Sequence, residues 1–224
     1  MEILRIQHNR RYRAAQIVKI LLKISKKIAV KSVACIKPFH SLVSTILSHR
    51  TRDEVTELVA DRLLEIYPTP EKLSEATISS IRKLIRKVGF YRVKAEWLKE
   101  IAATLVRDFN SEVPDNYEDL MKLSGVGRKT AGCVLVYGFG KPAIPVDTHV
   151  HRISNRTGLV STRTPEQTET ELISLLRKKD WLPLNHAFVE HGKKTCKPIK
   201  PLCSQCLIIS YCDYAKVNVM SCYQ

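Results

Sequence analysis

The chain has 224 residues, 44% of them hydrophobic, which suffices for one large core or two smaller lobes. Its formal net charge of +15 points to a polyanionic partner, usually nucleic acid, with an anionic membrane surface as the alternative. No run of about 18 apolar residues is present, which excludes an ordinary membrane-spanning helix. The basic N-terminus also lacks the apolar stretch of a signal peptide. We therefore expect an intracellular protein of the prokaryotic cytoplasm or nucleoid.

The spacing of apolar residues predicts helices from end to end, with little or no sheet. Residues 11–34 place Ile17, Leu21, Ile24 and Ile28 on one helical stripe. Residues 1–34 hold nine Lys or Arg and one acid, so this segment contributes +8 of the +15 charge. The apolar stripe indicates that this helix mainly packs against the rest of the protein. A DNA contact through Lys26 and Lys27 is compatible with that role.

Four more helices are expected further along the chain. They are marked by Val55, Leu58, Leu63 and Ile66, closed by Pro68 and Pro70; by Ile78, Ile81, Leu84 and Ile85, ending near Gly89; by Val93, Trp97, Ile101 and Leu105; and by Leu172, Leu175 and Leu176. Thr164-Pro165 is typical of an N-cap followed by proline in the first helical position. Short connections suit a compact helical protein.

A glycine hairpin lies at Leu123-Ser-Gly-Val-Gly-Arg-Lys-Thr-Ala131. Gly125 and Gly127 permit a tight turn, and the backbone N–H groups around Val126 together with the next helix N-terminus can hold a phosphate. An ordinary helix–helix turn is the alternative. Arg128 and Lys129, which follow directly, favour phosphate binding. Leu123 and Val126 are expected to anchor the hairpin in the core.

Four of the seven cysteines cluster near the C-terminus as C-x6-C-x2-C-x5-C, namely Cys196, Cys203, Cys206 and Cys212. In an intracellular protein such a cluster indicates metal ligands rather than disulfides. Cys35 and Cys133 stand in apolar contexts typical of small core residues. Cys222 receives no assignment.

These motifs, with Val146-Asp-Thr-His149 and Asn155-Arg156-Thr157, resemble endonuclease III from about Pro38 to Cys212. That is a family of helix–hairpin–helix DNA glycosylases and apurinic/apyrimidinic (AP) lyases. The resemblance implies an all-α, two-lobe fold. Residues 31–140 would form a helical barrel lobe, and residues 1–30 with 141–224 an iron–sulfur cluster lobe.

By this resemblance the four cysteines hold a [4Fe–4S] cluster, with zinc as the runner-up, because only Cys203 and Cys206 form the close pair typical of zinc sites. The cluster is expected to be structural. Lys193, Lys194, Lys197 and Lys200 lie just before or within its first loop. Lys197 and Lys200 are predicted phosphate contacts, and a solvated face is the alternative.

The resemblance also assigns the chemistry. Cleavage at an abasic site requires an amine that forms a Schiff base with the sugar, and a helix N-terminus with nearby cations favours the neutral, reactive amine. Lys129 is the expected nucleophile. Asp147 is the expected carboxylate for proton transfer or charge stabilisation. Without the resemblance, the residues favour a surface lysine for Lys129 and a helix cap for Asp147.

The chain departs from the family at Leu47-Ser-His-Arg-Thr-Arg-Asp53, where Ser-Ala-Gln-Ala-Thr-Asp is common. Arg50 replaces a glutamine that fills the gap left by the flipped nucleotide, and arginine can stack on and donate to the orphaned base. A phosphate contact or a salt bridge to Asp53 or Glu54 are the alternatives. His49 is expected to line a pocket or be satisfied in a helix, and His149, His151 and His191 receive no chemical role.

We thus predict a monomeric, bifunctional glycosylase and AP lyase that removes damaged pyrimidines from double-stranded DNA and cuts the abasic strand by β-elimination. A mismatch- or purine-specific glycosylase of the same superfamily is the enzymatic alternative. A metal-containing DNA-binding protein without catalytic activity is the other.

Overall fold

The computed structural model describes residues 2–24 and 37–218, with side chains described for residues 10–23 and 37–218. Within these ranges the chain is helical and contains no strand, which confirms the predicted all-α class. None of the helices in this part of the chain is long and apolar enough to cross a bilayer. Several residues singled out in the sequence lie outside the described ranges: Lys26, Lys27, Ile28, Cys35 and Cys222.

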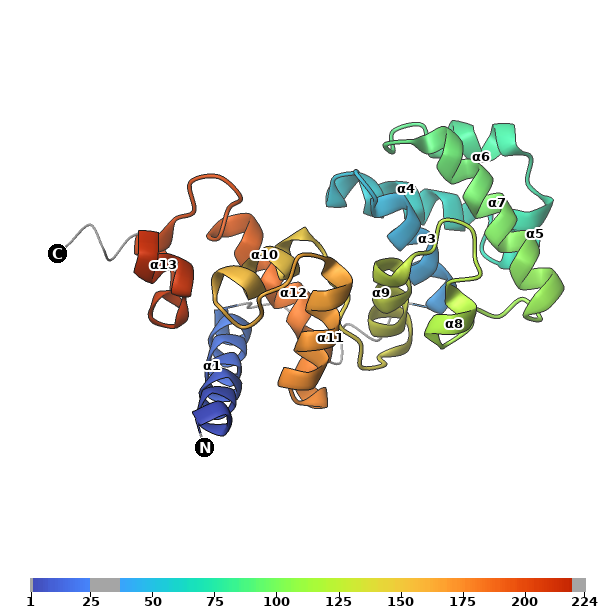
Figure 1. The fold of residues 1–224 in the computed structure, drawn as a ribbon. Coiled ribbons are helices and arrows are strands. Elements are labelled where there is room, and N and C mark those ends of the chain that lie inside the picture. Colours follow the sequence, from blue (N-terminus) through green and yellow to red (C-terminus); the bar gives the residue numbers. More distant parts are fainter. Residues whose placement is uncertain (1, 25–36, 219–224) are drawn as a thin grey trace. The chain divides into compact units, whose positions relative to one another are not determined.

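Figure 1 labels the helices. In chain order they are α1 (Glu2–Ile24), α3 (Pro38–Ser48), α4 (Asp53–Ile66), α5 (Pro70–Glu75), α6 (Ile78–Leu84), α7 (Tyr91–Asp108), α8 (Tyr117–Leu120), α9 (Arg128–Phe139), α10 (Thr148–Arg156), α11 (Pro165–Leu175), α12 (Lys178–Lys194) and α13 (Asp213–Asn218), with 3-10 turns η1 (Cys203–Gln205) and η2 (Ile209–Tyr211) before α13.

The helices form two compact units. One lies within Lys31–Lys141, and the other combines Met1–Val30 with Pro142–Gln224. The first therefore holds α3 to α9, and the second holds α1 and α10 to α13. That these units act as a helical barrel lobe and a cluster lobe stays a prediction.

Helix α3 lies at the centre of the first unit, packed against α4, α7 and α9. Its inner face is fully buried and consists of Leu42, Val43, Ile46 and Leu47. Gly138 on α9 faces the start of α3, where a Cβ at Gly138 would lie 3.1 Å from the Pro38 Cα. Glycine thereby lets the two backbones approach closely. Cys133 of α9 is buried, as expected for a small core residue.

Two of the helices predicted in this unit, α4 and α7, are present, but not all of the apolar residues that marked them are buried. In α4, Leu58 and Ile66 are exposed, at 63% and 49%. The buried face of α4 is instead Thr56, Val59, Ala60 and Leu63. Apolar residues on α4 occur on more than one side, and the small Thr56 and Ala60 let α4 lie against α3. In α7 the predicted Val93 is exposed, and its neighbour Lys94 is buried in its place.

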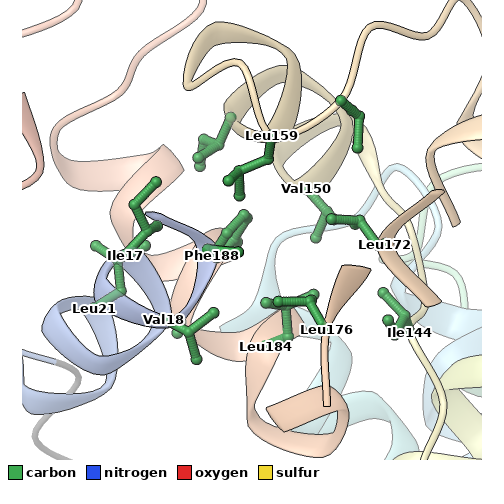
Figure 2. Close-up of a cluster of buried hydrophobic side chains, with 14 of the residues drawn as sticks. Ile17, Val18, Leu21, Ile144, Val150, Leu159, Leu172, Leu176, Leu184 and Phe188 are labelled. Carbon is green, nitrogen blue, oxygen red and sulfur yellow. The ribbon is translucent and has the colours of Figure 1, made fainter. Parts of the chain in front are cut away.

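The second unit has its own apolar core (Figure 2). Phe188 of α12 lies among side chains from α1, α10 and α11 and is fully buried. The predicted stripe of α1 contributes Ile17 and Leu21, both buried, together with Val18. Helix α11 begins as predicted, because Thr164 is its N-cap within a capping box and Pro165 is its first residue.

Arginines of α1 fasten it to this unit. The Arg10 guanidinium donates to the Leu159 carbonyl and to Glu171 at 2.9 Å. Arg13 donates to the Gly158 carbonyl and forms an ion pair of 2.8 Å with Asp213. Two of the basic residues of α1 are therefore used within the protein, in agreement with packing as the first role of this helix.

Candidate active site and cysteine cavity

The glycine hairpin joins α8 to α9 and is anchored as predicted. Leu123 and Val126 are buried, and the Val126 N–H donates to the Leu123 carbonyl at 3.1 Å. Val126 therefore serves as an internal anchor, and its N–H is already used. The N–H groups of Gly125 and Gly127 donate to no described residue, and the first turn of α9 adds further N–H groups without intrahelical partners. This end of α9 is suited to an anion.

The two glycines of the hairpin differ in backbone conformation and in surroundings. Gly125 has a φ of 72°, and a Cβ there would lie 2.5 Å from the Trp97 ring. Gly127 is extended, is exposed, and has no atom within 4 Å of an added Cβ. Gly125 is thus required by the fold of the hairpin. Gly127 leaves an open surface at the N-cap of α9.

Two cationic side chains follow the hairpin. Arg128 is exposed, and its guanidinium lies 5.0 Å from the centre of the Tyr117 ring. Lys129, the second residue of α9, is half-buried, and its amine forms no hydrogen bond or ion pair with the described residues. Lys129 therefore combines a partly desolvated position with an amine that is available for reaction.

His49 lies beside this part of α9. Its Nε2 is 3.1 Å from the Thr130 hydroxyl. Burial, and then the positive charges of Lys129 and Lys94, lower the pKa of His49 to about 4. The imidazole is therefore neutral at neutral pH and adds no charge next to Lys129. The contact with Thr130 agrees with the expectation of a satisfied histidine rather than a catalyst.

Residues 48–52, which we call the Arg50 turn, join α3 to α4. Arg50 is exposed, has a φ of 52°, and its guanidinium lies 5.3 Å from the centre of the Phe90 ring. Phe90 is also left-handed, with a φ of 57°, and is 62% exposed. Phe90 was not among the residues predicted from the sequence. Its signal was an aromatic residue directly after a glycine, Gly89, at a helix start.

Asp147 occupies the N-cap of α10, the structural role that the sequence had offered as the alternative. Its Oδ1 accepts from the N–H groups of His149 and Val150, at 2.9 and 2.8 Å. Its other oxygen, Oδ2, accepts from no described residue, and the side chain is half-buried. Capping and chemistry are thus compatible, because each uses a different oxygen. Lys129 and Asp147 lie in different units.

The remaining histidines have structural partners. His149 Nδ1 lies 3.0 Å from an Arg152 nitrogen, and burial lowers its pKa. His151 Nδ1 is 2.7 Å from the Thr168 hydroxyl. His191 is buried at 3.7 Å from the Cys206 sulfur, and burial lowers its pKa as well.

Cys196, Cys203, Cys206 and Cys212 line one cavity of the second unit, together with residues of α10 and α12. All four are free thiols. Burial, with a smaller contribution from the other cysteines, raises the pKa of Cys206 to about 11. Burial likewise raises the pKa of Cys203 and Cys212. A set of thiolates here needs a cation to offset desolvation and mutual repulsion.

Two arginines of α10 hold the first cysteine loop. Arg152 donates from Nε and Nη2 to the Cys196 carbonyl, at 3.1 and 2.8 Å. Arg156 donates to the carbonyls of Lys197 and Pro198, at 2.7 and 2.8 Å, and its Nη1 lies 3.5 Å from the Cys196 sulfur. Lys197 and Lys200 are exposed on this loop. Within the described residues, no three His, Cys, Asp or Glu side chains are close enough together to hold a single metal ion.

Residues 43–178 match the HhH-GPD superfamily of base excision DNA repair proteins. The chain is 51% identical to endonuclease III of Thermotoga maritima over 177 residues, which cover 79% of this chain and 83% of that protein. The chain belongs to the endonuclease III family. It is 36% identical to endonuclease III of Synechocystis over 217 residues, 96% of this chain and 99% of that protein.

Solved structures of the endonuclease III family have the same fold. One, described as a trapped endonuclease III–DNA covalent intermediate, matches with a TM-score of 0.83 at 32% identity, covering 92% of this chain and 97% of that chain. A non-covalent endonuclease III–DNA complex matches with a TM-score of 0.84 over the same shares. The protein is accordingly a DNA glycosylase and AP lyase of base excision repair. This confirms the family and the enzyme class predicted from the sequence.

Proposed function

We propose that this protein removes damaged pyrimidines from duplex DNA and cleaves the resulting abasic strand through a Schiff base on Lys129. The observation that carries the proposal is the position of Lys129. The half-buried amine has no partner among the described residues, and it follows directly on a hairpin with open backbone N–H groups. The related structure described as a trapped covalent intermediate with DNA supports a covalent step in this family.

In the proposed reaction the lone pair of the Lys129 amine attacks C1′ of the damaged nucleotide, and the bond from C1′ to the base breaks. The base leaves with the bonding electrons and takes up a proton. One proton of the amine passes to O4′ as the sugar ring opens, and the protonated imine that remains makes the C2′ proton acidic. Loss of that proton expels the 3′ phosphate by β-elimination, and water then hydrolyses the imine and frees Lys129. Asp147 would use its Oδ2 to stabilise the positive charge or to move a proton, while Oδ1 keeps the cap of α10.

Each unit offers residues that would contact DNA. The hairpin offers the N–H groups of Gly125 and Gly127 and the start of α9, with Arg128 beside them. Lys197 and Lys200 would add phosphate contacts from the first cysteine loop. Arg50, stacked on Phe90, would face the base left unpaired when the damaged nucleotide is extruded. Action as a monomer and a location in the prokaryotic nucleoid stay predictions.

We also propose that Cys196, Cys203, Cys206 and Cys212 hold a [4Fe–4S] cluster. Two observations support it. All four thiols line one cavity, and their spacing holds only one close pair, Cys203 and Cys206, whereas zinc sites usually have two. The cluster would stabilise the loop that presents Lys197 and Lys200.

Borohydride trapping tests the lyase function. The protein is incubated with an abasic duplex and with duplexes that carry oxidised pyrimidines, oxidised purines or mismatches. The reduced adduct is then digested and mapped by mass spectrometry. An adduct on Lys129 with the pyrimidine lesions supports the proposal. Efficient excision of only purines or mismatched bases would replace the substrate class, and binding without any adduct would favour the non-catalytic alternative.

Elemental analysis tests the cluster independently of activity. About four irons for each chain and broad absorbance near ~400 nm are expected for thiolate-bound iron–sulfur chemistry. One zinc and no iron for each chain would show that the four cysteines bind zinc instead.

A further inference from the structure

Lys94 is a buried cation without an acidic partner among the described residues. It is 1% exposed and is among the largest fully buried side chains in the described part of the protein. Lysine is almost never fully buried unless it is paired. Its Nζ donates to the carbonyls of Leu47 and His49, and it lies 3.5 Å from the Thr51 hydroxyl. Every one of these acceptors lies at the end of α3 or in the Arg50 turn.

This arrangement gives the ammonium a specific task. The last carbonyls of α3 have no partners within the helix and carry the negative end of its dipole. A cation that binds them completes the helix end and fixes the chain that leaves it. Burial lowers the pKa of Lys94 to about 8, so the side chain is still protonated at neutral pH. The buried charge is therefore present under the conditions in which the enzyme works.

Residues just before Lys94, at the start of α7, contact the Arg50 turn at a second point. A Cβ at Gly89 would lie 2.6 Å from the Arg50 carbonyl oxygen, so the two backbones are in close contact. The Gly89 N–H also donates to the Thr51 hydroxyl at 3.1 Å. Phe90 follows and places its ring next to the Arg50 guanidinium. Residues 89–94 therefore hold the backbone of the turn and at the same time supply the surface on which Arg50 rests.

We infer that Lys94 is a positioning residue for Arg50. Its ammonium binds the Leu47 and His49 carbonyls before Arg50 and lies 3.5 Å from the Thr51 hydroxyl after it, and this holds Arg50 in its left-handed conformation and in register with Phe90. A turn that is fixed before DNA binds loses less freedom when it meets the unpaired base. This inference rests on the proposed role of Arg50 in base extrusion, and it assigns to Lys94 an effect on excision rather than on strand cleavage.

The same helix contains a matched control. Lys99 of α7 donates from its Nζ to the carbonyls of Ser74 and Ala76, each at 2.7 Å, at the end of α5. Lys94 and Lys99 therefore perform the same local task at the ends of two helices. Only the turn held by Lys94 carries a proposed DNA contact. Lys99→Met reports what the loss of such a cap does by itself.

The test compares Lys94→Met, Lys99→Met, Arg50→Ala and the two double variants with Arg50→Ala. Two single-turnover rates are measured for each, excision of a damaged pyrimidine and cleavage of a ready-made abasic site, together with the thermal midpoint. Arg50→Ala is expected to lower excision more than abasic cleavage. Lys94→Met is expected to lower the ratio of the two rates roughly 10- to 100-fold, the scale of a displaced positioning group. It should add little in the Arg50→Ala background.

Lys99→Met should lower the thermal midpoint and leave the ratio of rates unchanged in both backgrounds. If Arg50→Ala lowers the ratio and Lys94→Met does not, the inference is overturned while the role of Arg50 stands. If Arg50→Ala itself leaves the ratio unchanged, the proposed role of Arg50 fails and the positioning role fails with it. Should Lys94→Met not fold, Thr51→Val removes the hydroxyl between Lys94 and Gly89. It should lower the same ratio to a smaller extent, and an unchanged ratio would overturn the inference.

Discussion

The glycine hairpin and the Arg50 turn belong to the same unit but are held in different ways. The hairpin is fixed by groups within a few residues of each other, since Leu123 and Val126 anchor it and their backbones share a hydrogen bond. Its contact with Trp97 is the main exception. The Arg50 turn has two internal hydrogen bonds, from the Thr51 N–H to the Ser48 carbonyl and from the Thr51 hydroxyl to the His49 carbonyl. It otherwise depends on residues 89–94 and on the contact between His49 and Thr130.

This difference matches what each segment is proposed to do. The hairpin presents backbone N–H groups to a phosphate, a task that is the same for every DNA sequence. The Arg50 turn presents a side chain to a base, and the chain departs from the family pattern there. Because the turn is held by residues distant in the sequence, its side chains can change without affecting the phosphate-binding hairpin or Lys129, which follows the hairpin. Substitutions in the hairpin and in the Arg50 turn test whether the two segments act independently.

The largest effect is expected from Lys129→Gln, which keeps the polarity of the side chain and removes the amine. Borohydride trapping and strand cleavage should be abolished while lesion binding stays measurable by gel shift. Lys122→Gln is the matched control, because Lys122 precedes the hairpin and pairs with Asp119 at 2.7 Å on the surface. Normal trapping by Lys129→Gln would transfer the nucleophile to another amine and end the assignment of the chemistry to α9.

Asp147→Asn is expected to slow the reaction by roughly 10²–10⁴, the scale of a positioned acid or base. Asparagine is as good an N-cap residue as aspartate, so the thermal midpoint should change little. Asp147→Ala removes the cap as well and should cost about 1 kcal/mol of stability. If Asp147→Asn retains full single-turnover rates while Asp147→Ala loses only stability, Asp147 is a cap and nothing more.

The two hairpin glycines should separate stability from binding. Gly125→Ala forces a side chain into a left-handed position and against Trp97, which should cost about 2–4 kcal/mol of unfolding free energy. Gly127→Ala meets no atom in the protein and should cost no more than about 1 kcal/mol, as alanine is a weaker N-cap residue than glycine. Denaturant titrations measure both.

DNA affinity completes this comparison. A methyl group at Gly127 should weaken binding, because it covers the surface that the phosphate would approach. Equal affinity of Gly127→Ala and the wild-type protein would place the phosphate elsewhere.

The Arg50 turn should respond to pH through Lys94. The pKa of Lys94 is about 8 in the folded protein and 10.5 in the absence of burial. Between these values the unfolded state binds more protons, so the unfolding free energy contributed by this group rises with pH, by up to about 3 kcal/mol. Urea titrations from pH 7.5 to 10 should show this rise in the wild-type protein and lose it in Lys94→Met. Identical pH profiles would show that Lys94 does not titrate in this range.

The smallest effect concerns the exposed lysines of the cysteine loop. Each phosphate contact that is lost should lower the slope of log affinity against log salt by about 0.9. Lys197→Gln and Lys200→Gln should do so one contact at a time. Lys194, which pairs with Glu190 at 2.6 Å, provides the control substitution. Slopes that match the Lys194→Gln control would assign Lys197 and Lys200 to the solvated face.

Several features of the site could be predicted from the sequence, because they depend on nearby residues or on the spacing of one residue type. The caps at Thr164 and Pro165 and the anchors Leu123 and Val126 depend on neighbours a few residues away. The four cysteines are recognised by residue type and separation alone. Asp147 shows the limit of such patterns, since the same residue at the same place is both a good N-cap and a candidate catalyst.

By itself, the sequence determined the helical class, the family, the hairpin and the cysteine set. Only the tertiary structure decided that Lys94 is buried while Leu58 is exposed, that Phe90 lies beside Arg50, and that Arg10 and Arg13 fasten α1. The physical reason is common to all of these. Whether a side chain is buried depends on partners brought close by folding, and the carbonyls that stabilise the Lys94 ammonium lie more than forty residues away along the chain. The helical periodicity of a sequence does not indicate which distant carbonyls will accept hydrogen bonds from a buried lysine.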